Sequence, residues 1–276
     1  MSSINTNASA MNALATLRTI NTSLTDTQGR VSTGLKVQSA KDNAAYFAIS
    51  ETMRSDSSMY RAIDESLTLS KNSISTGRLG AEAVVDLAQQ FTDRLAFAQQ
   101  EGVDRAKVQA ELDGLVAQIN TTIEQSTFNG QSMVDSTTAV TVVTGVTRDG
   151  GTFGTSTLTV NAVDLTAIHG ALDAIAITNA STSAEMETAL TTAETQLAAA
   201  IDGASSLGIA EKSIETQQKF LSSLSDRLDS GIGAMVDADM EKEAARLQAL
   251  QVQQQLATQS LSIANQAPQN ILSLFR

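Results

Sequence analysis

The chain has 276 residues, a formal charge of −12, no cysteine, no tryptophan, one histidine and one proline. Without cysteine it can form neither disulfides nor thiolate metal sites, and its acidity argues against a nucleic-acid partner. No apolar run reaches the roughly 20 residues of a membrane span, and the start, MSSINTN, lacks the pattern of a cleaved secretory signal. The Ala-rich, aromatic-poor composition favours thin helical bundles and, taken alone, a cytoplasmic protein.

The first predicted helix follows a heptad, in which apolar residues recur at alternating steps of three and four. Its members are Ala10, Ala13, Leu17, Ile20, Leu24, Thr27 and Val31. This spacing places one side chain per turn on one helix face, which packs against another helix. Residues 34–43 are predicted to form a loop after it.

A long helix is predicted next, from Ile49 to Ala98. The alternating steps continue through Met53, Asp56, Tyr60, Ile63, Leu67, Ser70, Ile74, Gly77, Ala81, Val84, Ala88, Phe91, Leu95 and Ala98. A repeat of this length requires a coiled partner along the whole helix. After a turn at Gly102, apolar residues from Val108 to Ile123 predict an antiparallel return helix that ends near residues 128–130.

The middle of the chain changes character. Two Thr/Val-rich stretches, 139–147 and 155–163, flank Arg148-Asp149-Gly150-Gly151 and predict a β-hairpin. Asp164 is expected to cap a short helix, and Thr182 with Glu185 fits a capping box. A second long helix follows, from Ala193 to Met235. The palindromic order of helices predicts that both chain ends lie at one end of the rod and the middle insert at the other.

The last thirty residues form a second seam with heptad spacing. Its members are Leu247, Leu250, Gln254, Ala257, Leu261, Ala264, Pro268, Ile271 and Phe275, and no charged residue lies between Arg246 and Arg276. A solvated helix usually carries a charged face, so this segment is expected to contact protein on more than one side. We expect the two terminal segments to pair, and the narrow pair to become stable only when neighbouring copies cover it.

No set of residues suggests catalysis, a cofactor site or a metal site. His169 is the only histidine, so it has no second imidazole with which to bind a metal. Asp237, Asp239, Glu241 and Glu243 are better explained by the positive end of a helix. The Gly-rich run 149–154 lacks the lysine and the strand–helix context of a phosphate loop. The sequence therefore predicts a protein that is not an enzyme.

Motifs at both ends of the chain resemble one family, the bacterial flagellins. Ile4-Asn5-Thr6-Asn7 is similar to the family's opening INTN, and Ser32-Thr33-Gly34-Leu35 with Ser39-Ala40-Lys41-Asp42 to its SSGL…SAKD segment. Phe128-Asn129-Gly130 resembles the FNG before its hairpin. Ala264-Asn265-Gln266, Pro268-Gln269-Asn270 and residues 272–276 resemble its closing ANQxPQNxLSLLR. These motifs lie within about the first 130 and the last 80 residues. Residues 135–180 resemble no motif of the family and correspond to its variable insert.

The resemblance implies a structural subunit that self-assembles into the flagellar filament for swimming motility. It further implies export through the flagellar type III apparatus without a cleaved signal, which replaces the cytoplasmic expectation with an extracellular one. The implied partners are other copies of the chain, cap and hook-junction proteins, and an export chaperone at the C-terminal region, with no nucleic acid and no membrane. Terminal helices of this family are disordered in the monomer and fold on assembly.

The expected fold is mainly α, a long antiparallel coiled-coil rod with a small β-hairpin insert and terminal helices forming an inner coiled coil. The expected domains are residues 1–44 with 236–276 for the terminal coiled coil, 45–135 with 181–235 for the rod, and 136–180 for the outer insert. The residues expected to form the subunit interface are Leu17, Ile20, Leu24, Leu247, Leu250, Leu261, Ile271, Leu274 and Phe275.

Two alternatives remain open from the sequence, a hook–filament junction protein and a cytoplasmic coiled-coil adaptor. One difference from the family concerns recognition by the vertebrate innate receptor. Flagellins seen by the vertebrate innate receptor carry an Arg-rich stretch on the first long helix, but residues 89–96 here read QQFTDRLA. We therefore expect weak recognition or none.

Overall fold

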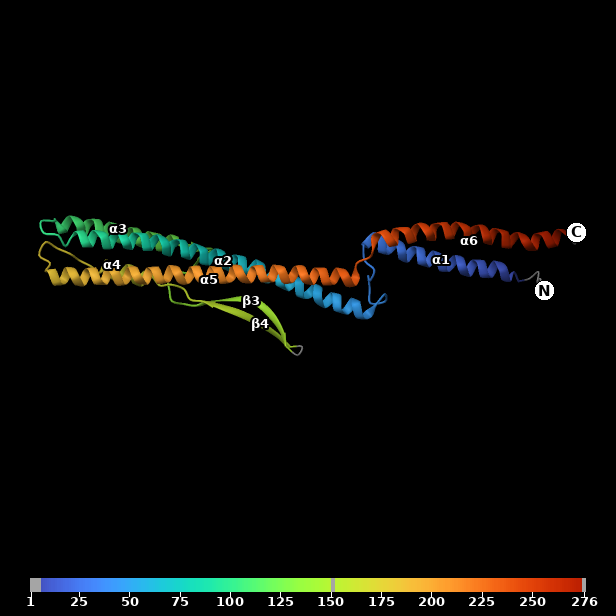
Figure 1. Cartoon of the computed structure of the whole chain (residues 1–276), viewed down its shortest axis with the longest axis horizontal. Helices are drawn as coiled ribbons and strands as arrows, with labels where there is room; N and C mark the ends of the chain where they lie inside the picture. The colour runs from blue at the N-terminus through green and yellow to red at the C-terminus, as the bar shows by residue number, and fades with distance from the viewer. Residues whose placement is uncertain (1–5, 150–151, 275–276) are drawn as a thin grey trace. The chain divides into compact units, whose positions relative to one another are not determined.

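The fold was established from a computed structural model, which describes residues 6–149 and 152–274, except for the side chains of 148–149, 152–153 and 267–274. The described elements, in chain order, are α1 (Ala8–Thr33), α2 (Ala44–Phe97), α3 (Arg105–Gln125), β1 (Thr127–Phe128), β2 (Gln131–Ser132), β3 (Val140–Asp149), β4 (Thr152–Val160), α4 (Leu165–Asp173), α5 (Ser183–Val236) and α6 (Met240–Leu274) (Figure 1). The expected mainly helical fold with a small hairpin insert is confirmed.

The chain divides into two compact units. Unit 1 contains the residues up to Asp56 and those from Arg227 onward, and unit 2 contains Ser57–Asp226. The long helices α2 and α5 each contribute to both units. No finding tests the three-part domain division expected from the sequence, so its boundaries stay a prediction.

The core of unit 2 follows the predicted heptad closely. On α2, every predicted position from Ile74 to Ala98 is buried. On α5, a buried side chain recurs every seven residues at Met186, Ala193, Ala200, Leu207, Ile214 and Leu221. From α3, the side chains of Val108, Leu112, Val116, Ile119 and Ile123 join the same cluster. The small Ala side chains at several of these positions allow the helices to approach one another closely.

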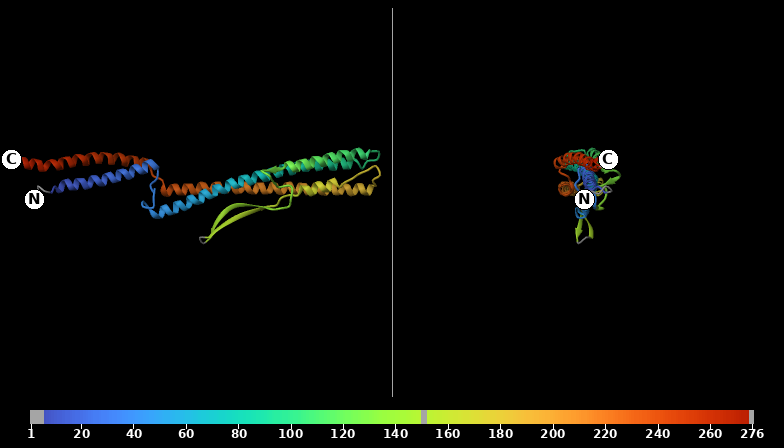
Figure 2. Two further views of the ribbon diagram at one scale, coloured as in Figure 1. Left: turned by 180° about the vertical axis from the view of Figure 1, so that it is seen from behind. Right: turned by 90° about the vertical axis from the view of Figure 1, so that its right-hand side faces the viewer.

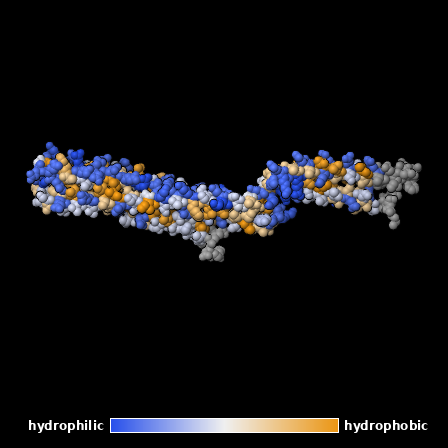
Figure 3. Space-filling view, viewed as in Figure 1, coloured by the Kyte–Doolittle hydropathy of each residue, from blue (hydrophilic) through white to orange (hydrophobic). Residues whose placement is uncertain are grey.

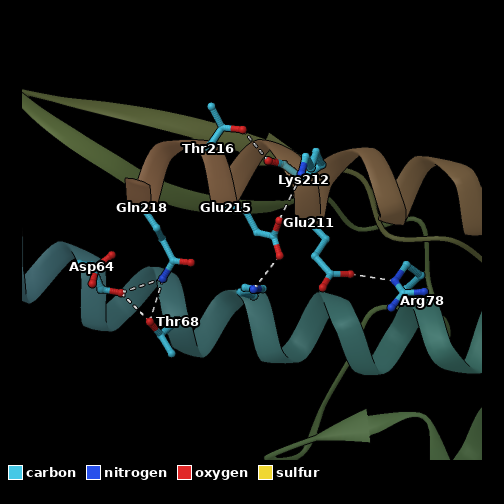
Figure 4. A network of polar contacts seen from close by, with 9 residues as sticks. Asp64, Thr68, Arg78, Glu211, Lys212, Glu215, Thr216 and Gln218 are labelled. Carbon is cyan, nitrogen blue, oxygen red and sulfur yellow. Dashed lines mark hydrogen bonds and ion pairs between the residues drawn. The ribbon is translucent and has the colours of Figure 1, made fainter. Parts of the chain in front are cut away.

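Polar side chains link α2 to α5 along the outside of this core (Figure 4). Arg78 Nε lies 2.7 Å from Glu211 Oε2, and Lys71 Nζ lies 2.8 Å from Glu215 Oε1. Gln218 Nε2 donates to Thr68 Oγ1 at 2.8 Å. Residue numbers rise along α2 as they fall along α5, so the two helices are antiparallel. The ion pair raises the pKa of Lys71 and lowers that of Glu215, chiefly through the hydrogen bond between them.

Two hairpins follow α3. The first joins β1 to β2 through Asn129 and Gly130, whose φ angles of 51° and 75° are those a tight two-residue hairpin requires. The second is the predicted hairpin, in which β3 pairs antiparallel with β4 and Val140 lies opposite Val160. A register shift between Val143 and Gly145 leaves Thr144 as a bulge in β3.

The insert departs from its expected position. Only its last part lies where α2 turns into α3: there Arg105 donates through its backbone N to Asn179 Oδ1 at 2.9 Å and through Nη1 to Ser181 O at 2.7 Å. The β3–β4 hairpin instead lies beside α5, where Gln217 Nε2 donates to Thr144 O at 2.7 Å. The helical order alone could not indicate this fold-back, because it depends on a tertiary hydrogen bond and on burial of Val142 and Val160 in the helical core.

Both predicted caps are present. Asp164 Oδ1 accepts from Ala167 N at 2.9 Å and begins α4. At the start of α5, Thr182 N donates to Glu185 Oε2 at 2.7 Å, and Glu185 N donates to Thr182 Oγ1 at 3.4 Å. The bond from the Thr182 backbone lowers the pKa of Glu185 below its ordinary value.

The capping box gives a pH-dependent prediction. Because the pKa of Glu185 is lowered in the folded chain, its stabilising effect is present above the ordinary carboxyl pKa and is lost as the pH falls through the folded value. Glu185→Ala should therefore reduce thermal stability at neutral pH, with the difference from wild type shrinking in acid. Thermal unfolding followed by circular dichroism checks this, with Glu187→Ala as the matched control. An equal loss in both variants would contradict the role of the cap.

Candidate assembly surface

Unit 1 is built on the pairing of α1 with α6, which lie side by side in every view (Figures 1 and 2). Asn7 Nδ2 donates to Ala264 O at 2.8 Å, and Gln254 Nε2 donates to Asn21 Oδ1 at 2.7 Å. Arg30 Nη1 lies 3.5 Å from Glu243 Oε1. Numbers again run in opposite directions, so the helices are antiparallel.

The two predicted terminal seams face each other within this pair, and we call the contact the inner seam. It contains Ala10, Ala13, Leu17, Ile20, Leu24, Thr27 and Val31 of α1 and Leu247, Leu250, Gln254, Ala257, Leu261 and Ala264 of α6. Thr27 and Leu250 are buried and the others are half-buried. The pairing of the chain ends expected from the sequence is therefore present.

The residues predicted to join subunits are thus brought together inside one chain. Leu17, Ile20, Leu24, Leu247, Leu250 and Leu261 all belong to the inner seam. The Ile271 and Leu274 side chains, and Phe275 as a whole, lie outside the described residues. A contact between these residues and another copy of the chain stays a prediction.

A second set of apolar side chains on α1 and α6 points away from the inner seam, and we call it the outer stripe. On α6 it contains Val252, Leu256 and Ile263, which are 55%, 60% and 65% exposed, and on α1 it contains Met11, which is 66% exposed, and Leu14. Steps of four and seven place the three α6 residues on one helix face, roughly opposite Leu250 and Leu261. Figure 3 shows hydrophobic side chains on the visible surface of these helices.

The outer stripe is not among the seams predicted from the sequence. The one sequence signal for it is the absence of charged residues between Arg246 and Arg276, which predicts that this segment contacts protein on more than one side. The spacing that fits the stripe is the same heptad shifted in phase, so only the position of α1 shows which phase faces inward. Exposed glutamines, including Gln251 and Gln255, separate the two apolar faces.

The link between α1 and α2 is hydrogen-bonded to the link between α5 and α6. Lys36 N donates to Val236 O at 2.6 Å, and Ala238 N donates to Gly34 O at 2.8 Å. Gly34 has a φ of 73°, which favours glycine at this end of α1. Val37, Ile232 and Val236 form a small separate core beneath these bonds.

Acidic side chains in this region have structural partners. In the loop before α2, Asp42 Oδ2 accepts from the backbone N of Gln38 and of Ser39, which lowers the pKa of Asp42. Asp239 Oδ1 accepts from Lys242 N at 3.1 Å and caps α6. Glu243 is only 8% exposed, and its Oε2 has no hydrogen-bond partner among the described residues. The predicted favourable placement of acids at this helix start agrees with the acidic first turn of α6.

The described residues lack two features. They contain no group of three or more His, Asp or Glu side chains arranged to hold a metal ion. None of the described helices combines the length and hydropathy needed to cross a membrane.

Comparison with known proteins identifies the family. Residues 4–139 match the bacterial flagellin N-terminal helical region, and residues 185–275 match the bacterial flagellin C-terminal helical region. The chain is 40% identical to a flagellin of Brucella melitensis and 34% identical to flagellin C of Rhizobium meliloti, with 100% of each chain covered in both alignments.

One solved structure, described as a flagellar hook-associated protein of Vibrio parahaemolyticus, is similar with a TM-score of 0.50 at 12% identity. The match covers 72% of this chain and 99% of that one. At this identity the likeness concerns the fold alone. The two terminal matches and the full-length relatives carry the assignment: the chain belongs to the bacterial flagellin family.

Proposed function

We propose that the outer stripe joins neighbouring subunits when this flagellin assembles. As a member of its family, the chain is a structural subunit of the extracellular bacterial flagellar filament. The observation that supports the proposal is the pair of opposite apolar faces on α6, of which α1 covers only one. Because residues 247–275 include no charged side chain, a second protein can cover the other face without desolvating an ion.

Burial of the outer stripe would provide substantial free energy. A Leu, Ile or Val side chain transferred fully from water contributes about 1.5–3 kcal/mol. The inner seam alone is only half-buried, and a narrow helix pair of this kind has little core of its own. Unit 1 therefore gains stability from neighbouring copies, in agreement with the coupling of folding and assembly that the family resemblance implies.

Other roles rest on the family rather than on contacts in this structure. We propose that the subunit is exported through the flagellar type III apparatus, meets a chaperone at its C-terminal region and adds beneath cap proteins beyond the hook junction. We also propose that residues 1–44 and 236–276 form the inner tube. No catalytic role, nucleic-acid partner or membrane partner is proposed. The full-length flagellin relatives favour a filament subunit over a hook–filament junction protein or a cytoplasmic adaptor.

A charge in the outer stripe should block assembly. Leu256→Glu would place a carboxylate at the centre of the proposed contact, and loss of one buried Leu alone corresponds to about a tenfold to hundredfold weaker association. Pelleting across a concentration series measures this as a rise in the critical concentration. Gln251→Glu adds the same charge at an exposed position on another face of α6 and should leave assembly near wild type. Equal pelleting of both variants would contradict the proposed contact.

Deletion of residues 247–276 should abolish polymerisation, because it removes the α6 side of both apolar faces. Most of α2 and α5 should remain helical, since their core lies in unit 2 and lacks α6 residues. Circular dichroism and electron microscopy of the truncated chain check the two expectations together. Ordinary filaments from this chain would count against the assignment of assembly to α6.

The proposed weak recognition by the vertebrate innate receptor concerns residues 89–96 of α2. Phe91 and Leu95 are buried in the helical core, while Arg94 is exposed and lies 3.5 Å from Glu111 Oε2. Residues 89–96 contain a single Arg, so they carry less positive charge than the Arg-rich stretch of the flagellins that this receptor recognises. A cellular reporter assay on purified monomer should show a weak response beside a flagellin that carries that pattern. A response of equal strength would show the expectation to be wrong.

A further inference from the structure

One charged side chain continues the heptad of the inner seam. Glu243 precedes Leu247 by four residues and Leu250 by seven, so it lies at the next heptad position toward the start of α6. It is only 8% exposed, whereas Glu241, in the same first turn, is exposed. A polar residue at a buried heptad position sets the partner and the register of a coiled coil at a cost in stability.

The start of α6 does not require a buried carboxylate. Asp239 Oδ1 already caps the helix by accepting from Lys242 N. Glu241 also places a carboxylate in the first turn, where it interacts favourably with the positive end of the helix. Burial of Glu243 adds nothing to either interaction, so it calls for a separate explanation.

The charge that compensates Glu243 comes from α1. Arg30 Nη1 lies 3.5 Å from Glu243 Oε1, and the two side chains are 31% and 10% exposed. Glu243 Oε2 is buried and has no hydrogen-bond partner among the described residues. The carboxylate is therefore only partly compensated even beside Arg30. A partner helix without a cation at this level would leave it buried and unpaired, which is strongly unfavourable.

The α6 helix of another copy is a partner of that kind. The seam of α6 has the same heptad spacing as that of α1, so spacing alone permits two copies to pair α6 with α6. In a parallel pair of equal register, Glu243 would lie opposite its equivalent in the second copy. In an antiparallel pair along the whole seam, it would lie against residues 247–275, which include no charged side chain. Both arrangements bury a carboxylate without a cation, whereas pairing with α1 supplies Arg30.

We propose that Glu243 makes α6 select α1, rather than the α6 of a neighbouring copy, as its partner in the inner seam. Specificity of this kind depends on a penalty against the wrong partner as well as on contacts with the right one. The inference rests on the proposed function in one respect, because assembly brings the α6 helices of several copies together. The outer stripe then meets the neighbours while the inner seam stays with α1.

Disulfide formation reports the choice of partner, because the chain has no native cysteine. Gln254 lies in the inner seam, and its Nε2 donates to Asn21 Oδ1 at 2.7 Å. A chain with both Asn21→Cys and Gln254→Cys should therefore form its disulfide within one chain in pelleted filaments. In a chain with Gln254→Cys alone, a covalent dimer requires the α6 helices of two copies to meet at this position.

The dimer from Gln254→Cys is the decisive readout. Adding Glu243→Leu should raise its yield about tenfold, because this substitution removes the penalty for pairing with another α6. Glu241→Leu is the matched control: it makes the same substitution at an exposed position of the same turn and should leave the yield unchanged. Equal yields from the two variants would overturn the proposal.

A charge exchange keeps the test decisive if Glu243→Leu does not assemble. In the soluble chain with Asn21→Cys and Gln254→Cys, Arg30→Glu should slow the intrachain disulfide about tenfold, because it brings two carboxylates together. Arg30→Glu combined with Glu243→Arg should restore most of the rate. A purely steric role for Glu243 predicts no recovery, so an exchanged chain as slow as Arg30→Glu would overturn the proposal.

The two proposals fail in different measurements. If the outer stripe is not a subunit contact, Leu256→Glu pelleting equals that of wild type while the disulfide pattern still depends on Glu243. If Glu243 does not select the partner, the disulfide pattern is the same in Glu243→Leu and Glu241→Leu while Leu256→Glu still blocks pelleting.

Discussion

In unit 2, α5 buries one side chain every seven residues, and buried side chains at the heptad positions of α2 belong to the same cluster. This interlocking is the interaction on which the other elements depend. It gives α3, α4 and the hairpin a continuous apolar surface against which to pack, and their buried side chains all belong to one cluster. The same repeat in unit 1 reaches only half-burial for most of its members. The same heptad repeat thus gives unit 2 a fully buried core and gives unit 1 a seam that is mostly half-buried.

Polar contacts select among the registers that this repeat permits. A heptad can slip by seven residues and still bury apolar side chains, but Arg78 and Lys71 would then lose Glu211 and Glu215. In unit 1, Arg30 and the buried Glu243 have the corresponding role for α1 and α6. Partly exposed ion pairs contribute little to stability individually, so their main effect here is on alignment.

Much of this architecture could be predicted because its signals are local. The heptad positions on α2, the caps at Asp164 and Thr182, and the existence of the β3–β4 hairpin are each set by residues close to one another in the sequence. The features that sequence reasoning missed all depend on a distant neighbour. The fold-back of β3 requires Gln217, and the outer stripe is recognisable only once α1 is seen against the other side of α6. Leu250 and Leu261, predicted to join subunits, lie in the inner seam of one chain, and their contact with another copy stays a prediction, because spacing alone cannot tell a contact within one chain from a contact between two.

The bonded links at Gly34 and Ala238 have a mechanical consequence. A tensile load along α6 reaches Ala238, where the covalent backbone continues into α5 and a hydrogen bond leads across to Gly34. The strain is therefore shared between two routes, with the small core of Val37, Ile232 and Val236 resisting separation of the links. Within unit 1, the hydrogen bonds at Gly34 and Ala238 therefore restrain the two links against each other.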